Sequence, residues 1–272
     1  MNTTPTTEFG QIAVLVKVGE HKVGARIGGA GAPIILFHSL LADGSSFDPL
    51  ARLLAATHRV VILDLPGFGN SDRVEGGLEA VADRLAAAIR EFNYTQAPIF
   101  LGNGYGGFVA LLTVIRHPDL AGKLVLADCG AVFSEAGRAA FKGMSAGAAA
   151  NGLAGIADVA MRRLFSLDFQ AANPVLVAQR RERFLEVDPQ TFHAACAALS
   201  TLDLRADLAS VTVPVLVLVG EHDEATPPPM SVELAESLPH ATLTVLSGCA
   251  HVPQLQQPDQ FMAAIADFIS PA

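Results

Sequence analysis

The chain has 272 residues, 51% of them apolar, and a formal net charge of -9 at pH 7. This length suits one large α/β domain with an insertion, or two small domains. An acidic chain without a run of Lys and Arg is a poor match for nucleic acid or an anionic membrane surface. The polar start, Met1 to Phe9, lacks the pattern of a signal peptide, and no apolar stretch reaches the roughly 20 residues of a membrane-spanning helix. We therefore expect neither nucleic-acid nor membrane partners.

The three cysteines lie far apart in the sequence, at positions 129, 196 and 249. Their number and spacing fit neither a disulfide framework nor a zinc site. A sparse, odd set of cysteines is typical of a reducing compartment, so we expect a cytoplasmic protein without a bound metal.

Short apolar runs alternate with helical patterns along most of the chain. After a hairpin at residues 11–18 and 23–28, strands are expected at residues 32–37, 60–65, 98–101, 123–127, 213–219 and 242–246. Helices are expected at residues 47–56, 78–92, 105–116, 230–238 and 258–269. Continuous apolar runs are typical of strands buried on both faces of a parallel sheet. Strands that alternate with helices indicate βαβ units, so the sequence predicts an α/β fold.

Residues 133–208 interrupt this alternation. They show no strand pattern, Ala, Arg and Leu dominate, and helical periodicity is visible at residues 155–166 and 175–186. We predict a helical lid at 133–208, inserted into a core made of residues 1–132 and 209–272. The alternative is that these helices only cover a face of the sheet.

The turn at residues 102–107, Gly-Asn-Gly-Tyr-Gly-Gly, follows a strand and precedes a helix. This is the context of the nucleophile elbow, G-x-S-x-G, in which a sharp turn presents a serine oxygen above a parallel sheet. Gly104 stands at the position of that serine and has no side chain. The sequence therefore predicts a serine-type site without its usual nucleophile.

Two later loops carry candidates for the remaining chemistry, and both follow expected strands, where ligands bind in open α/β sheets. Asp223, in the loop 220–227, is the candidate acid that orients a histidine. His251, in the Gly-rich turn 248–253, is the candidate general base, since elbow, acid and base follow one another in the order expected for such a triad. Asp128 also ends a strand and is an alternative acid.

The elbow glycines support a competing interpretation. Gly102, Gly104 and Gly107 spell G-x-G-x-x-G, and Asp128 follows at about the spacing of the acid that binds a ribose in dinucleotide sites. That fingerprint normally lies in the first strand–helix turn, whereas at least two expected sheet strands precede it here. A dinucleotide site also leaves Asp223 and His251 without a role. We therefore favour hydrolysis without a cofactor.

Together, these segments resemble the α/β-hydrolase superfamily over nearly the whole chain. The matching segments are FHSL, DLPGFGNSD, GNGYGG, GEHDEATPP and GCAHVPQLQQPDQF. The second half is most similar to 3-oxoadipate enol-lactonases, through RRLFSLDFQAANP, FHAACAALSTLDLRADL and the final His loop. The resemblance implies a mostly parallel eight-stranded sheet with helices on both faces, a helical cap and a Ser-Asp-His triad.

Carried over residue by residue, the resemblance places the nucleophile at Gly104, the acid at Asp223 and the base at His251. The backbone amides of Leu40 and Tyr105 are the expected oxyanion-hole donors. As further residues of the substrate pocket we expect His38, Ser39, Phe141 and Phe165.

Gly104 departs from the family pattern. We interpret the chain as a hydrolase of a small lactone or carboxylic ester in which glycine replaces the nucleophilic serine by design, so that it binds substrate without turnover. The alternatives are a natural ligand-binding homologue, an enzyme in which His251 activates water directly, and a C–C bond hydrolase with the same triad. The expected partner is a small acyl substrate, and the sequence leaves a homodimer open.

Overall fold

The structure, a computed structural model, describes residues 3–5 and 11–270. The segment Met1 to Phe9, for which the sequence predicts no signal peptide, lies largely outside these residues. Within the described part of the chain, every helix is too short or too polar to cross a lipid bilayer.

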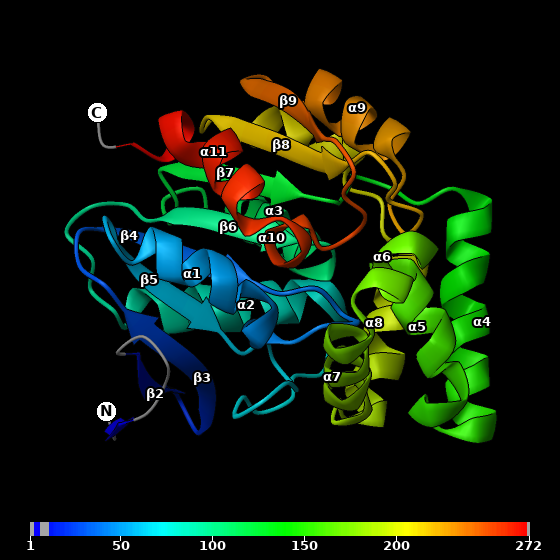
Figure 1. Ribbon diagram of the computed structural model, residues 1–272. Coiled ribbons are helices and arrows are strands. Elements are labelled where there is room, and N and C mark those ends of the chain that lie inside the picture. The colour runs from blue at the N-terminus through cyan, green and yellow to red at the C-terminus, as the bar shows by residue number, and fades with distance from the viewer. Residues whose placement is uncertain (1–2, 6–10, 271–272) are drawn as a thin grey trace.

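One mixed sheet forms the centre of the molecule (Figure 1). Its strands are Thr3–Pro5 (β1), Ile12–Val18 (β2), His21–Gly28 (β3), Ala32–Phe37 (β4), His58–Leu63 (β5), Ile99–Asn103 (β6), Lys123–Ala127 (β7), Val215–Gly220 (β8) and Ala241–Leu246 (β9). Their order is β1-β2-β3-β5-β4-β6-β7-β8-β9. The strands from β4 to β9 are parallel to one another, whereas β1, β2 and β3 pair antiparallel.

The predicted mostly parallel sheet is confirmed, and β2 to β9 are the eight strands expected. The short β1 pairs with β2 and adds a ninth strand. Its three residues are too few for an apolar pattern, so it was not predicted.

Helices connect and flank the strands. The α-helices are Asp48–Leu54 (α1), Gly77–Arg90 (α2), Tyr105–Arg116 (α3), Glu135–Asn151 (α4), Ala157–Leu164 (α5), Leu167–Ala172 (α6), Pro174–Leu185 (α7), Pro189–Thr201 (α8), Pro228–Ser237 (α9), Pro253–Gln256 (α10) and Pro258–Ile269 (α11). Short 3-10 helices occur at Gly44–Phe47, Leu153–Ile156 and Arg205–Ser210.

Apolar side chains of the strands pack against helices on both faces of the sheet. Along β4, Ile34 and Leu36 belong to a buried cluster with α1 and α11, whereas Ile35 and Phe37 belong to a cluster with α2, α3 and the helices after β7. Because alternate side chains point to opposite faces of a strand, a continuous apolar run supplies both clusters. The strands were predicted on the ground that a strand buried on both faces is apolar throughout, and this is what the two clusters show.

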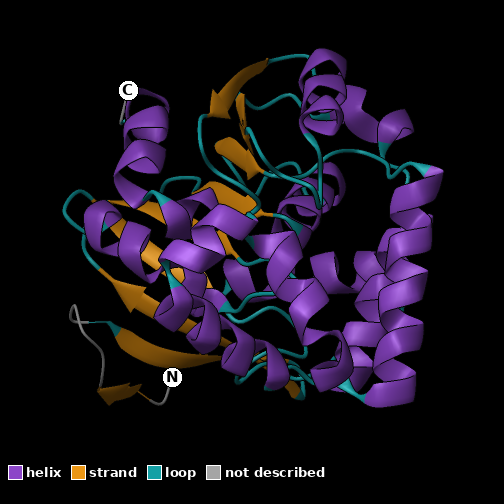
Figure 2. Ribbon diagram, turned by 45° about the vertical axis from the view of Figure 1, so that its right-hand side comes forward, coloured by secondary structure: helices purple, strands orange, loops and turns teal. Residues whose placement is uncertain are grey.

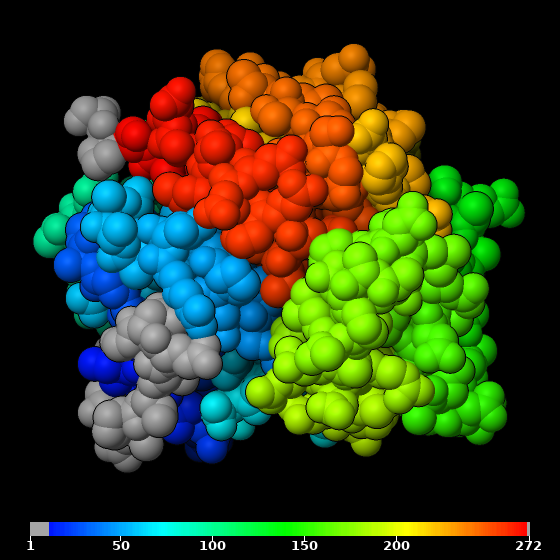
Figure 3. All heavy atoms as spheres, in the orientation of Figure 1, coloured from blue at the N-terminus to red at the C-terminus, as the bar shows by residue number. Residues whose placement is uncertain are grey.

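The helices α4 to α8, which we call the insertion, lie between β7 and β8 in the chain. Figures 1 and 2 show them as a group beside the sheet, next to the ends of the parallel strands. On the face shown in Figure 3, the atoms of the insertion (yellow-green) meet those of the C-terminal segment (orange-red). The insertion is therefore placed beside the edge of the sheet at which a ligand site is expected.

Candidate active site

The loops that follow β4, β6, β8 and β9 meet at one end of the sheet, and they carry Ser39, Gly104, Asp223 and His251. The Ser39 hydroxyl and the Asp223 carboxylate lie 3.3 and 2.9 Å from the two ring nitrogens of His251. Residue 104 adjoins the same ring, because a Cβ built on Gly104 would lie 2.6 Å from His251 Nε2. The candidate acid and the elbow thus both lie within contact range of the candidate base.

Glycines allow the elbow between β6 and α3 to lie against the end of β4. Gly104 has φ 54° and ψ -122°, a conformation that glycine adopts more readily than other residues. A Cβ on Gly106 would collide with the carbonyl oxygen of Phe37, the last residue of β4. The first amides of a helix have no acceptor within it, so the start of α3 presents free N–H groups at this junction.

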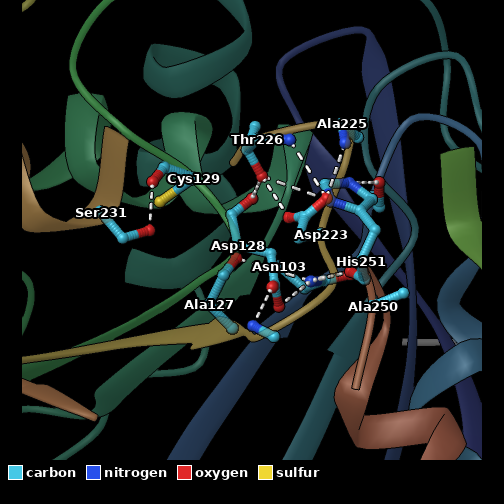
Figure 4. Close-up of polar contacts among 12 residues, drawn as sticks. Asn103, Ala127, Asp128, Cys129, Asp223, Ala225, Thr226, Ser231, Ala250 and His251 are labelled. Carbon is cyan, nitrogen blue, oxygen red and sulfur yellow. Dashed lines mark hydrogen bonds and ion pairs between the residues drawn. The ribbon is translucent and has the colours of Figure 1, made fainter. Parts of the chain in front are cut away.

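The candidate acid is held by several donors and is almost completely buried (Figure 4). Besides the ring of His251, the carboxylate of Asp223 accepts hydrogen bonds from the N–H of Ala225 and the N–H of Thr226, and the Thr226 hydroxyl lies 2.6 Å away. Burial opposes ionisation, but the charge of His251 and the hydrogen bonds from His251 and Thr226 outweigh it and hold the pKa of Asp223 below its ordinary value. The Asp223 carboxylate therefore stays charged beside the imidazole.

Asn103 ties the elbow to the loop of the candidate base. Its side-chain amide donates to the backbone oxygen of His251 at 2.9 Å, and its own side-chain oxygen accepts from Gln254 at 3.0 Å. Sequence analysis missed both residues. The position of Asn103, between the first two glycines of the elbow, is the only signal that pointed to it.

A second carboxyl, Asp128, lies buried beside the acid–base pair. Its Oδ1 accepts a hydrogen bond from the N–H of Gly220 at 2.8 Å. Burial, together with the negative charge of Asp223, raises the pKa of Asp128 well above its ordinary value, which favours the neutral carboxyl. Among the described residues the ring of His251 bonds to Asp223 and not to Asp128, so Asp128 does not occupy the position of the orienting acid.

A small cavity of about 30 Å³ opens beside these groups. Ser39, Gly104 and His251 line it together with Leu40 and Tyr105, whose amides are the candidate oxyanion donors. Its volume is about that of one water molecule in the liquid. A larger cavity of about 700 Å³ shares one lining residue, Tyr105, with it. The cavity beside His251 is thus too small for a substrate unless the surrounding walls shift.

The remaining wall of the small cavity is largely apolar and comes in large part from the insertion. It includes Phe108, Phe133, Phe141, Met144 and Leu199. Of the two phenylalanines expected in the pocket, Phe141 lines this cavity. Phe165 does not, since its ring stacks on Phe169 within the insertion, with 5.1 Å between centroids.

One guanidinium, that of Arg163 on α5, also lines the small cavity. It is the only Lys or Arg among the described lining residues, and it forms no ion pair with a described residue. Burial lowers the pKa of Arg163, although the negative charge of Asp223 opposes the shift. An unpaired cation in an apolar cavity favours an anionic ligand group.

His38, expected in the pocket, supports the loop beneath it instead. The ring is fully buried and packs edge-on against Phe68. Its Nε2 accepts from the N–H of Leu65 at 3.2 Å, so Nδ1 carries the hydrogen and donates to the backbone oxygen of Ser39 at 3.0 Å. Burial lowers the pKa of His38, which keeps this neutral tautomer. His38 therefore fixes the backbone that presents Ser39.

The cysteines are free and buried. Burial raises the pKa of Cys196 to about 12 and that of Cys249 to about 11, and it raises the pKa of Cys129 further. All three are therefore weak nucleophiles near neutral pH. In residues 3–5 and 11–270, His, Cys, Asp and Glu side chains form no group of three or more that suits a metal ion.

Comparison with known proteins places the chain in the alpha/beta hydrolase family. Its sequence matches the alpha/beta hydrolase family over residues 34–264. It is similar to a pimeloyl-[acyl-carrier protein] methyl ester esterase of Chromobacterium violaceum, with 30% identity over 247 residues, 89% of this chain and 95% of the relative. The 3-oxoadipate enol-lactonase 1 of Acinetobacter baylyi is 26% identical over 245 residues, 89% of this chain and 90% of the relative.

A similar backbone is known from a solved structure. The enol-lactonase from Burkholderia xenovorans LB400 superposes with a TM-score of 0.88 at 26% identity, covering 95% of this chain and all of that one. The resemblance read from the sequence motifs is confirmed at the level of the superfamily.

Proposed function

The chain belongs to the alpha/beta hydrolase family, and on this basis we propose that it hydrolyses the acyl bond of a small carboxylic ester or lactone at the site around His251. The observation that carries the proposal is the 2.9 Å contact between Asp223 Oδ2 and His251 Nδ1. A buried carboxylate in this position fixes the tautomer of the ring and stabilises its protonated form. The other nitrogen, Nε2, is then free to accept a proton in the cavity.

In the proposed reaction His251 acts as general base and then as general acid. It takes a proton from the attacking oxygen and returns it to the leaving oxygen of the ester or lactone. The amides of Leu40 and Tyr105 donate to the carbonyl oxygen as negative charge develops on it. Losing one such donor costs on the order of 10²–10³ in kcat.

The cavity favours an acyl substrate that carries a negative charge. Its wall is apolar apart from the groups around His251 and the guanidinium of Arg163. An aliphatic chain would contact Phe108, Phe141 and Met144, and a terminal carboxylate would pair with Arg163. We therefore propose a small ester or lactone with a carboxylate as the substrate class.

The missing oxygen at Gly104 supports a second candidate, in which the protein binds such a ligand without turnover. This is the nucleophile knockout expected from the sequence. The two candidates share the pocket and differ only in whether another group replaces the elbow serine.

A panel of matched substrates tests the proposal. We expect hydrolysis of monomethyl adipate to exceed that of methyl hexanoate, because only the former carries a carboxylate. His251→Asn and Asp223→Asn are expected to lower kcat by about 10⁴-fold or more, as in other triads. Arg163→Gln should raise KM for monomethyl adipate alone, and Arg162→Gln, exposed on the same helix, is the matched control.

Two results would contradict the proposal. Wild-type protein that binds monomethyl adipate in calorimetry and hydrolyses no ester or lactone of the panel would favour the binding protein. Hydrolysis that persists unchanged in His251→Asn would place the chemistry elsewhere.

A further inference from the structure

We propose that Ser39 is the nucleophile of this hydrolase, so that the loop after β4 supplies the oxygen that the elbow lacks. This inference rests on the proposed function and adds the group that it leaves unassigned. In this chain serine and glycine stand at positions 39 and 104. Among the described residues, Ser39 carries the only hydroxyl in contact with His251 Nε2, whereas the Thr226 hydroxyl lies 3.3 Å from the other ring nitrogen, Nδ1.

The first support is the position of the hydroxyl. Ser39 Oγ lies 3.3 Å from His251 Nε2, the nitrogen that faces the cavity. A Cβ built on Gly104 would lie 2.6 Å from the same hydroxyl and 2.6 Å from the same nitrogen. Ser39 Oγ therefore occupies the space that a side chain at residue 104 would need, beside the nitrogen that such a side chain would contact.

The second support is the way in which Ser39 is held. Its backbone oxygen accepts from the ring of His38 at 3.0 Å and from the N–H of Ala42 at 3.3 Å. Its hydroxyl, by contrast, has no partner among the described residues other than His251. A fixed backbone with a hydroxyl that contacts only a base is the arrangement of an activated nucleophile.

The third support is access to the oxyanion donors. Ser39 is buried but lines the small cavity, and so do Leu40 and Tyr105. A carbonyl carbon in this cavity would lie between the hydroxyl of Ser39 and those two amides. Ser46, a neighbouring buried serine, lines no part of the cavity, and its hydroxyl has no partner.

The chemistry balances without a further reagent. The Oγ–H proton of Ser39 passes to His251 Nε2 as Oγ bonds to the carbonyl carbon. The carbonyl π electrons move to oxygen and return as the carbon–oxygen bond of the ester or lactone breaks. The leaving oxygen takes the proton from His251. Water then attacks the acyl-Ser39 ester, gives one proton to His251, and releases the carboxylic acid as the proton returns to Ser39 Oγ.

The same geometry predicts how residue 104 responds to mutation. In Gly104→Ser the new Cβ would crowd both Ser39 and His251, so we expect this variant to gain no activity over wild type. The double change Ser39→Gly with Gly104→Ser removes the contact with Ser39, leaves only the His251 ring to adjust, and returns an oxygen to the elbow. It should be active, with its covalent label at residue 104.

Covalent labelling tests the assignment directly. We expect a fluorophosphonate to add one mass increment to the wild-type chain, and peptide mapping to place it on Ser39. Ser39→Ala should lose the increment and at least about 10⁴-fold in kcat, with an unchanged melting temperature. Ser46→Ala is the matched control and should keep both the mass increment and the kcat of wild type.

Ser39→Cys gives a readout that a structural role would not change. The thiol of Ser39→Cys should react with iodoacetamide at least tenfold faster than the same thiol with His251→Asn added, which keeps its access to the cavity. The thiol of Ser46→Cys, buried away from the cavity, should react slowly. The native cysteines give little background, because their burial keeps them protonated.

The outcomes separate this inference from the proposed function. Hydrolysis by wild type that persists in Ser39→Ala, without a label at residue 39, would overturn the inference and leave the proposed function standing. Equal alkylation of Ser39→Cys with and without His251→Asn would also overturn it. An inactive wild type with an active Gly104→Ser variant would overturn it in favour of the knockout.

Discussion

At the scale of single residues, the unusual feature next to the site is a pair of buried carboxyls. Asp128 and Asp223 are both shielded from water, and each affects the other's ionisation. The Asp223 carboxylate is stabilised by His251 and Thr226, whereas Asp128 meets mainly burial and the charge of Asp223. The pair therefore holds one negative charge over the pH range in which Asp128 keeps its proton.

The pair predicts a pH-dependent effect of Asp128→Asn on stability. A carboxyl whose folded-state pKa is raised stabilises the fold below its unfolded-state pKa, and this contribution is lost as the pH rises toward the folded-state pKa. Asparagine has no such loss, and its amide can still accept from the N–H of Gly220. We expect the free energy of unfolding of Asp128→Asn to rise relative to wild type between pH 5 and pH 8, by at most about 1.4 kcal/mol per pH unit.

Urea unfolding at several pH values measures this difference. Asp259→Asn, in the first turn of α11, provides a control on the surface. A difference between Asp128→Asn and wild type that stays constant with pH would contradict the raised pKa.

Part of the site was predictable from the sequence, and part was not. Asp223 and His251 could be picked out because each follows an apolar strand in a loop of distinctive composition. The role of Ser39 was hidden, because its contact with His251 depends on how closely β4, β6 and β9 approach one another. The expected pocket role of His38 was wrong for a similar reason, since only the fold shows that its ring points away from the cavity into the loop.

At the scale of elements, the approach of α3 to β4 brings Ser39 next to the elbow. Glycine at position 106 is what permits it, because the first turn of α3 lies against the carbonyl oxygen of Phe37. The elbow and the loop after β4 are thus one structural unit. A change in the first turn of α3 is transmitted to Ser39 without altering any polar group of the site.

This unit predicts opposite effects for two Gly→Ala substitutions. In Gly106→Ala the new methyl group would collide with backbone that cannot move away, so we expect a loss of about 2 kcal/mol or more in the free energy of unfolding and loss of the site geometry. In Gly143→Ala, within α4, no atom lies within 4 Å of the new Cβ. We expect that variant to be more stable by about 0.5–1 kcal/mol.

Thermal and urea unfolding of both variants measure the two effects against the same wild type. Equal stability of Gly106→Ala and wild type would show that β4 and α3 can separate at no cost. In that case the proximity of Ser39 to residue 104 would not be imposed by packing.

The strands and helices of the core were predicted better than the helices of the insertion. The parallel strands were found because their apolar runs are buried on both faces, and α3 because it follows the Gly-rich turn of the elbow, although it is buried on all sides over residues 105–114. Three helices of the insertion, α4, α6 and α8, were not predicted individually. Much of α4 is Gly and Ala, and few of its residues are large and apolar, so its sequence carries little periodicity. Its helical state depends on packing against α8.

At the scale of the whole molecule, the insertion forms one wall of the cavity beside His251. Three phenylalanine rings in contact join the insertion to the core. Phe141 of α4 packs edge-on against Phe133, and Phe133 is tilted against Phe108 of α3. All three rings line the cavity beside His251. The cavity has a volume of only about 30 Å³, so we expect the insertion or these rings to move when a substrate binds. The lid predicted from the sequence stays a prediction.

This arrangement predicts that a smaller side chain at residue 141 lowers the stability of the protein and favours longer acyl substrates. Replacing this buried ring with alanine should cost about 3–5 kcal/mol of stability, because Phe133 loses its edge-on partner. The same change enlarges the cavity, so kcat/KM for esters with longer acyl chains should rise relative to that for short ones. Phe169→Ala is the matched control, since Phe169 lies in the insertion and stacks on Phe165 outside the cavity wall.

Unfolding measurements and a series of monomethyl esters of dicarboxylic acids distinguish the two variants. Both should be less stable than wild type, and only Phe141→Ala should shift its preference toward longer chains. An equal shift in both variants would mean that looser packing of the insertion, rather than the wall at Phe141, governs access to His251. Chain-length selectivity would then be a property of how readily the insertion moves, and substitutions far from the cavity would alter it as effectively as those that line it.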